Sequence, residues 1–334
     1  MKYYFENLEE PLGNWSSLLI KVKNNKKPNF RVECYDYGKI KLIINNKTIF
    51  WGTPENHSYE FLLLKEKEES FFKELPIKPI NSYEIEKRKN LFDTFYFKEW
   101  SIFFAKSLCE NKNNFLYDGL WLMVPYIPEK RTDWKYKALT YQRHDLINHL
   151  YDIDKALIRE DFYDLDWFSQ ELYCVLGIKD TPKENSSRVK FWRKKIKENS
   201  LPPIFILYLS FLEEFIIIDG HSRLMASILE NVKPKIIAIY PIKENNISID
   251  NYIKLNSLKN IEINYNNSQI EVKKTNDLLI NLFKENKKFK TLFTFFIQKN
   301  INNIWDNEVK NRFKEINLMN KFDLFVSRKG NYKS

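Results

Sequence analysis

The sequence predicts an α+β fold, in which an α/β domain is flanked by a β-rich N-terminal module and a mixed, partly helical C-terminal region. Three observations support this prediction. Short runs of branched and aromatic residues, separated by turn residues, recur in the first 75 residues, as in an antiparallel meander. Large apolar residues at helical spacing follow over 82–114. After residue 204 a strand, a strand, a turn, a helix and a strand succeed one another, which is the pattern of an α/β unit.

The first 80 residues form the predicted β-rich module. Asn24-Asn25 and Asn45-Asn46 are turn signals between its apolar runs, and Pro76 and Pro79 indicate its end. The expected strands are Leu18–Val22, Phe30–Cys34, Lys39–Ile44 and Tyr59–Leu64. Residues 81–154 are predicted to be a connecting region that is mainly helical, with one buried strand at 120–125 and a further helix at 146–157.

Residues 155–245 are predicted to form the α/β domain. A helix over Val189–Glu198 follows a polar break, and Ser186 or Ser187 is its expected N-cap. The remaining expected elements are strands at Ile204–Leu209, Phe215–Ile218 and Lys235–Tyr240, a tight turn at Gly220 and a helix over His221–Glu230. Residues 246–334 alternate Ile and Lys over 259–274 and then show helical spacing at 278–297 and 309–316, so we expect a basic α+β or helical region there.

Composition excludes several classes of protein. Apolar residues make up 43% of the 334 residues, which is too many for a disordered chain. The longest apolar runs fall short of the roughly 20 residues that a membrane-spanning helix needs, and the first residues lack a signal-peptide pattern. The three cysteines lie far apart and predict neither a disulfide framework nor a metal site. We therefore expect a soluble, cytoplasmic protein with no membrane partner and no metal ligands of its own.

The formal net charge of +10 is concentrated near the C-terminus. Residues 251–334 hold 16 basic and 8 acidic residues, a net charge of +8, whereas the first 250 residues carry only +2. A basic region of this kind attracts phosphate backbones, so nucleic acid is one expected partner of 251–334. Only 10 of the 54 basic residues are arginine, and a lysine-rich solvated surface explains the same composition.

The segment from Asp219 to Arg223 carries most of the functional information. A buried strand ends at Asp219, turns at Gly220 and opens a helix whose first N–H groups favour an anion such as phosphate. Gly220, His221, Ser222 and Arg223 are therefore the candidate phosphate-binding residues. Arg223 can add a bidentate contact, and Asp219 and His221 are the candidate catalytic residues. Alternatively, Asp219 and Arg223 simply pair at the helix start, His221 is a surface residue in the first turn with no task, and Ser222 only caps the helix.

This segment and its flanks resemble the ParB/sulfiredoxin-like superfamily. The resemblance covers about 155–245 and rests on Leu201-Pro-Pro-Ile-Phe-Ile, Ile217-Ile-Asp-Gly-His-Ser-Arg-Leu-Met-Ala and Lys235-Ile-Ile-Ala-Ile. It implies a compact α/β fold in which a Gly-x-x-Arg turn cradles the phosphates of a nucleotide. Sulfiredoxins carry a nucleophilic cysteine directly after the motif glycine, where this chain has His221. The resemblance therefore disfavours sulfiredoxin chemistry.

Two other branches of the superfamily match the turn to different degrees. The CTP-switching ParB proteins have Gly-Glu-Arg-Arg, and His221-Ser222 replaces the Glu-Arg pair here. Free-serine kinases of the superfamily use Asp-Gly-His-His-Arg, from which only Ser222 departs. The resemblance also implies a catalytic carboxylate near the first strand, for which Glu160, Asp161, Asp164 and Asp166 remain open alternatives.

The leading hypothesis is a nucleotide-binding protein that hydrolyses a nucleoside triphosphate or transfers its phosphoryl group. The implied cofactor is ATP or CTP with Mg²⁺, because charge neutralisation is most of what phosphoryl transfer requires. One alternative is a DNA-binding or nuclease-like protein related to ParB, acting through the basic C-terminal region. Another is a non-enzymatic protein–protein interaction module that keeps the fold and binds a protein partner.

Overall fold

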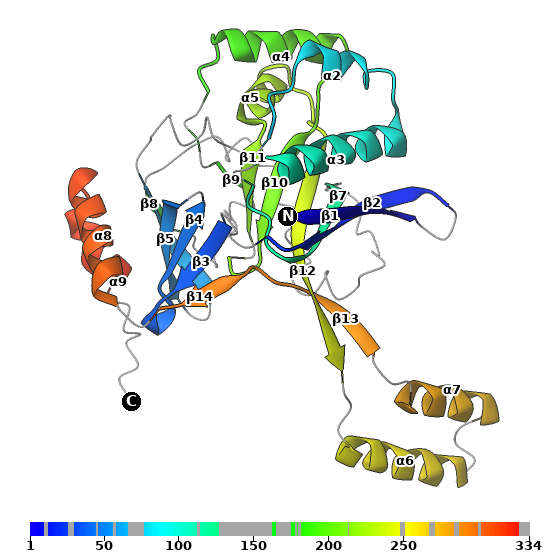
Figure 1. Cartoon of the computed structure of the whole chain (residues 1–334). Coiled ribbons are helices and arrows are strands. Elements are labelled where there is room, and N and C mark those ends of the chain that lie inside the picture. The colour runs from blue at the N-terminus through cyan, green and yellow to red at the C-terminus, as the bar shows by residue number, and fades with distance from the viewer. Residues whose placement is uncertain are drawn as a thin grey trace.

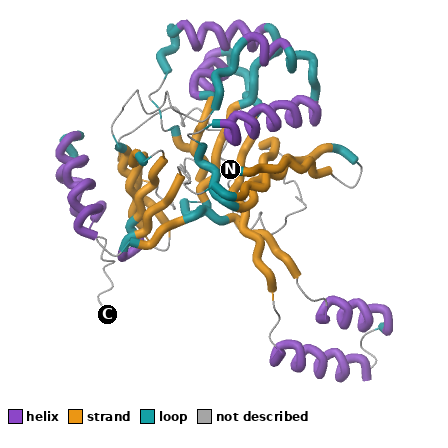
Figure 2. Tube along the Cα trace, in the orientation of Figure 1, coloured by secondary structure: helices purple, strands orange, loops and turns teal. Residues whose placement is uncertain are grey.

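The chain folds into two β-sheets covered by helices, and the predicted α+β class is confirmed (Figure 1). The computed structural model describes residues 1–9, 13–25, 30–44, 46–55, 58–65, 77–111, 114–126, 162–164, 175–177, 179, 182–212, 214–247, 251–266, 271–283, 287–299 and 302–326. Figure 2 shows strands of the two sheets at the centre and helices at the periphery.

The larger sheet has eight strands and holds the segment that carries the motif. Their order is β1-β2-β7-β12-β10-β11-β9, and β13 pairs with the far end of β12. β10 runs antiparallel to β11 and parallel to β12, so the chain crosses over β10 between β11 and β12. The strands are β1 (Lys2–Glu9), β2 (Trp15–Lys23), β7 (Gly119–Tyr126), β9 (Val175–Leu176), β10 (Ile204–Leu209), β11 (Glu214–Asp219), β12 (Ile236–Ile247) and β13 (Lys287–Leu292).

The smaller sheet has six strands in the order β14-β3-β4-β5-β6-β8. Neighbouring strands from β3 to β8 pair antiparallel, whereas β14 joins β3 in parallel. The strands are β3 (Phe30–Cys34), β4 (Ile40–Ile44), β5 (Lys47–Glu55), β6 (Ser58–Leu64), β8 (Phe162–Asp164) and β14 (Phe296–Gln298). The strands of residues 1–80 are thus divided between two sheets, because β1 and β2 belong to the larger one.

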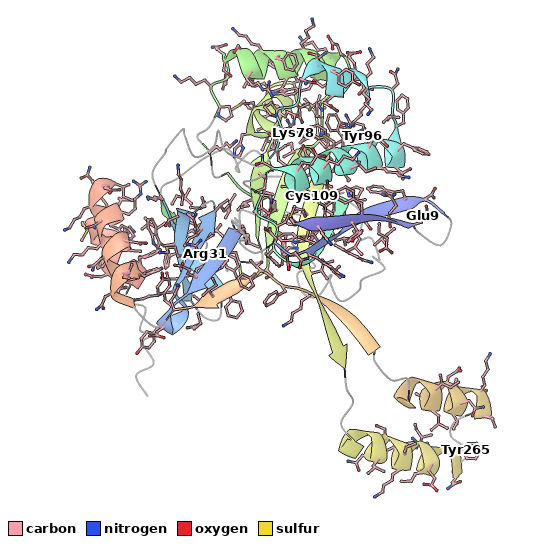
Figure 3. All side chains as sticks on the ribbon, viewed as in Figure 1. Glu9, Arg31, Lys78, Tyr96, Cys109 and Tyr265 are labelled. Carbon is pink, nitrogen blue, oxygen red and sulfur yellow. The ribbon has the colours of Figure 1, made fainter. Side chains whose placement is uncertain are left out.

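Helices cover the two sheets separately. In Figure 1, α2, α3, α4 and α5 lie together at the top of the larger sheet, α8 and α9 lie against the smaller sheet, and α6 and α7 extend away on the β12–β13 ribbon. The helices are α2 (Ser82–Glu86), α3 (Asp93–Glu110), α4 (Ser187–Lys197), α5 (His221–Leu229), α6 (Asn251–Asn266), α7 (Val272–Phe283), α8 (Asn302–Glu315) and α9 (Phe322–Val326). Figure 3 places Tyr265 on this outlying helix pair.

One large apolar core joins α3 and α4 to the sheets. Trp100 and Phe104 of α3 and Trp192 of α4 are fully buried in it with Phe205 of β10. The Phe104 and Phe205 rings stack with their centroids 4.6 Å apart. The Tyr96 hydroxyl of α3 donates to the Leu201 carbonyl at 2.7 Å, which ties this helix to the chain just before β10. α3 and α4 are therefore held against the larger sheet by this core.

A cluster of charged residues fixes α8 to the smaller sheet, and we call it the α8 cluster. Lys39 pairs with Asp306 at 2.6 Å, and Lys41 pairs with both Glu308 and Glu33, at 3.2 and 3.3 Å. The Trp51 indole N–H donates to Glu308 at 3.0 Å and the Tyr35 hydroxyl to Glu33 at 2.8 Å. Burial alone would raise the pKa of Glu33, but Tyr35 and Lys41 hold it below its ordinary value.

Most predicted elements are present, and one is wrong. The four strands expected in the first 80 residues are β2, β3, β4 and β6, and Ser186 caps α4 by accepting from the Val189 N–H at 3.3 Å. The helix expected over 278–297 is wrong in its second half, because α7 ends at Phe283 and β13 and β14 follow. The long β12 strand offers an open edge there, and pairing with it decides the local structure. The helix expected at 146–157 lies outside the described residues.

Candidate functional site

The five predicted site residues lie in one turn between β11 and α5. Gly220 has φ of 122°, a conformation that residues with a side chain rarely adopt. A Cβ at this position would lie 3.1 Å from Ile204 Cγ2 and 3.2 Å from Arg223 Nη2. The turn therefore requires glycine for its backbone conformation and also for the close approach of Arg223.

Arg223 points back across the turn to Asp219. Its Nη2 donates to the Asp219 carboxylate at 2.7 Å and to the Pro203 carbonyl at 3.0 Å, and the side chain is only 2% exposed. Burial would raise the pKa of Asp219, but the Arg223 guanidinium holds it below its ordinary value. The pairing expected at the helix start is therefore present. Arg223 Nε is buried with no hydrogen-bond partner within the described part of the chain, so the pair leaves this donor unused.

His221 is buried at the first position of α5. Neither ring nitrogen has a hydrogen-bond partner among the described residues, although the side chain is only 5% exposed. The pKa of His221 is lowered to about 3, mainly by burial and to a lesser extent by the charges of Lys179 and Arg223, against the opposing effect of Asp219. The imidazole is therefore neutral at physiological pH and offers one donor and one acceptor. Buried polar atoms without partners are unusual in folded proteins and indicate a place for a ligand or water.

These residues line a cleft of about 420 Å³ between α4 and α5. The structure adds three cations that the sequence analysis did not single out, namely Lys179, Lys183 and Arg188. The Arg188 and Arg223 guanidinium carbons lie 4.7 and 5.4 Å from the centre of the Trp192 ring. In the sequence, the polar break before α4 could have pointed to these cations. The packing of α4 against α5 brings them to the motif.

The cleft has a strong excess of positive charge. Among the described residues, four cationic side chains line it, at Lys179, Lys183, Arg188 and Arg223, together with the carboxylate of Asp219. Burial lowers the pKa of Lys179, and Asp219 only partly offsets this effect. The first N–H groups of α5 have no side-chain cap and add the positive end of the helix dipole. An anion bound here would neutralise the excess charge and accept hydrogen bonds from the unused donors.

Of the four carboxylates that the family resemblance implies, only Asp164 lies in the described backbone. It belongs to β8, where it pairs with Phe61 in the smaller sheet. Glu160, Asp161 and Asp166 lie outside the described residues. Within the described ranges there is no group of three or more His, Cys, Asp or Glu side chains that could hold a metal ion.

No family model matches this chain, and comparison with curated proteins and with solved structures gave no match. The described ranges contain no helix that is both long enough and apolar enough to cross a membrane.

Proposed function

We propose that the chain binds the phosphates of a nucleoside triphosphate in the cleft between α4 and α5 and hydrolyses it or transfers its phosphoryl group. The observation that carries the proposal is the charge of the cleft, where four cations face one carboxylate that is already paired with Arg223. A single phosphate monoester carries at most two negative charges near neutral pH, whereas a triphosphate matches an excess of three positive charges better.

The residues of the turn have different roles in this proposal. Arg223 and the first N–H groups of α5 bind phosphate oxygens, and Asp219 holds Arg223 in place. Lys179, Lys183 and Arg188 neutralise the charge that spreads over the transferring group, which is the main requirement of phosphoryl transfer. His221 is the proposed proton-transfer residue, because its neutral ring has an unused acceptor. Asp219 is less suited to act as a base while its carboxylate is bound to Arg223.

The Mg²⁺ ion expected with the nucleotide does not fit as an ion held by the described residues alone. Mg²⁺ prefers oxygen ligands, and Asp219, which accepts a hydrogen bond from Arg223, is the only carboxylate among the described residues that line the cleft. We therefore derive no step through a metal ion. The phosphates themselves fit, because buried donors of His221 and Arg223 lack partners in the part of the chain that the structure describes.

The proposal includes the ParB/sulfiredoxin-like assignment of the region around 155–245. Its support is the arrangement of β11, Gly220 and α5, followed by β12 beside β10, together with the turn sequence. DNA binding or nuclease activity through the basic C-terminal region and a purely protein-binding role remain the alternatives. Both alternatives predict that no nucleotide binds in the cleft.

Thermal unfolding with ATP, ADP, CTP and GTP, each with and without Mg²⁺, tests the proposal. A ligand that binds only the folded state adds about 2.7 kcal/mol at 100 times its Kd. We expect one nucleotide to stabilise the wild type and to lose this effect in the variant Lys183→Gln/Arg188→Gln, which removes two cleft cations. The control Lys310→Gln/Lys314→Gln removes the same charge from exposed positions on α8 and should keep the effect.

Turnover is measured on the same proteins as nucleoside diphosphate released. His221→Gln should abolish turnover while the nucleotide still stabilises the protein. If no nucleotide stabilises the wild type, or if the cleft variant responds as the α8 control does, the proposal is wrong.

A further inference from the structure

The outer side of α4 carries a stripe of lysines that the proposed nucleotide site does not use. α4 contains six basic residues and no acidic one. Lys190, Lys194 and Lys197 recur at the spacing of one helix face, and all three are exposed. Val189 and Trp192 are buried on the opposite side. Figure 3 shows side chains extending outward from α4 at the top of the molecule.

Little negative charge compensates this lysine stripe. Lys190 and Lys197 form no salt bridge within the described ranges, and Lys194 lies 3.8 Å from a Glu198 carboxylate that Lys195 already binds at 2.6 Å. The side chain of Lys194 is 75% exposed, so its own pairing contributes little. The stripe is therefore a solvated row of positive charge from Lys190 to the C-terminal end of α4, about 11 Å long at 1.5 Å per residue.

Exposed aromatic rings lie beside the C-terminal end of this stripe. Tyr83 of α2, Phe92 before α3 and Phe95 in its first turn are 71%, 66% and 67% exposed. The ion-pair distance of 4.0 Å between Lys195 and Glu86 places α2 directly against α4, as Figure 1 also shows. A single exposed ring needs no explanation, but these three belong to neighbouring segments, α2 and the start of α3, and grouped exposed apolar side chains mark interaction surfaces.

A pocket of about 520 Å³ lies at the C-terminal end of α4, and it is lined by Phe92 and by Glu198, whose carboxylate is 3.8 Å from Lys194. Phe92 lines it together with the amide-bearing Asn90 and Asn199 and with Ser200. Its acidic lining residues, Glu86 and Glu198, are both paired with lysines. A flat ring with polar edges fits this composition, because Phe92 offers a face for stacking and the two amides offer both donors and acceptors.

We propose that the outer face of α4, with Tyr83, Phe92 and Phe95, binds single-stranded nucleic acid. Phosphates lie along Lys190, Lys194 and Lys197, and bases stack on the aromatic rings, with one base entering the pocket at Phe92. A positive track beside aromatic rings is how proteins hold single strands without reading their sequence. Duplex bases are already stacked on each other and cannot use the rings, so the surface selects single strands. This proposal does not depend on nucleotide binding in the cleft.

Fluorescence anisotropy with labelled oligothymidine, oligouridine and a duplex of the same length tests this surface. We expect the single strands to bind more tightly than the duplex. The variant Lys190→Glu/Lys194→Glu/Lys197→Glu should weaken binding and lower the slope of log K against log salt by about 2, since each phosphate contact contributes about 0.7. The control Lys310→Glu/Lys314→Glu/Lys321→Glu makes the same charge change at exposed positions in the C-terminal helices and should keep the wild-type slope.

The aromatic rings give a second, independent readout. Phe92→Ala/Phe95→Ala should weaken single-strand binding at least about tenfold, the lower range for loss of base stacking, without changing the salt slope. Thermal unfolding of each variant checks that the fold is kept. Three outcomes overturn the proposal, namely no binding of either single strand at low salt, equal affinities of the stripe variant and its control, or binding only to vesicles of anionic lipid.

Discussion

The molecule contains two partly buried groups of charged residues that differ in how completely they are satisfied. In the α8 cluster, Lys39 and Lys41 face the carboxylates of Glu33, Asp306 and Glu308, so acids and bases nearly balance. Among the described residues that line the cleft between α4 and α5, four cations face one carboxylate. The cleft also contains buried nitrogens of His221 and Arg223 that have no hydrogen-bond partner among the described residues. In the α8 cluster no charged atom is both buried and without such a partner.

This difference separates a structural role from a binding role. The α8 cluster connects a helix to a sheet, and each of its charges has an internal counterpart, so nothing further is needed. The cleft is incomplete by the same criteria, because burying the nitrogens of His221 and Arg223 Nε without partners among the described residues costs free energy. Such an unfavourable free energy of burial is tolerated where a bound ligand offsets it. The comparison therefore supports the proposed ligand binding in the cleft and a purely structural role for the α8 cluster.

The largest expected effect is that of Asp219→Ala. This change removes the carboxylate that pairs with Arg223 and leaves this buried guanidinium without an ion-pair partner among the described residues, which costs about 3–5 kcal/mol of unfolding free energy. Urea denaturation measures the loss. Because the missing charge is negative, a bound triphosphate should restore part of the stability. Asp219→Asn is the matched control, since it keeps a hydrogen-bond acceptor at the same place and should lose less.

Gly220→Ala should cost about 1–3 kcal/mol, because alanine at this φ is strained and its Cβ would crowd Ile204 and Arg223. Gly13→Ala is the control, since Gly13 also has a positive φ but its Cβ would meet nothing within 4 Å. Differential scanning calorimetry of the two variants compares them. Equal losses would mean that close packing at Gly220 contributes nothing.

The neutral His221 should make the protein sensitive to acid. Its pKa is lowered to about 3 in the folded protein, so the unfolded chain binds the proton first as the pH falls through about 6.5. Stability is therefore complete above that pH and should fall by about 2 kcal/mol between about pH 7 and pH 5. His221→Leu cannot take up the proton, and the difference between wild type and variant isolates this contribution. An identical pH dependence of the two proteins would show that His221 is not buried in its neutral form.

The smallest effect is expected in the α8 cluster. Glu308→Gln removes a charge that pairs with Lys41 but keeps an acceptor for the Trp51 N–H, and Glu308 is partly exposed. The expected loss is about 1 kcal/mol of unfolding free energy, with unchanged stabilisation by nucleotide. Chemical denaturation with and without nucleotide measures both quantities. A change in the response to nucleotide would contradict the separation of the two charged groups.

Local patterns predicted the elements around the motif well. The apolar run before Asp219, the glycine and the Ser186 cap depend on neighbours in the chain, and the structure confirms each of them. The helix expected over 278–297 failed because pairing with the distant β12 overrides the local preference of Lys287–Leu292. The division of the first strands between two sheets depends equally on distant partners, since β2 pairs with β7.

The candidate site was predicted only in part for the same reason. All five residues from Asp219 to Arg223 lie in one stretch of chain, so the sequence identifies them together. Lys179, Lys183 and Arg188 reach the cleft only through the packing of α4 against α5. The burial of His221 depends on this packing as well, and the sequence alone suggested a surface position as one alternative. The excess of positive charge, which carries the functional proposal, is therefore a property of the folded chain.

The most direct test follows the backbone N–H of His221 while a nucleotide is added. The chain contains four histidines, so a protein labelled with [15N]histidine gives few amide signals, and His221→Gln identifies the one from the first turn of α5. We predict that this signal shifts in a saturable way with a nucleoside triphosphate, and that the shift is lost in Lys183→Gln/Arg188→Gln but kept in Glu308→Gln. A His221 signal that stays in place at millimolar concentrations of every nucleotide would contradict the account.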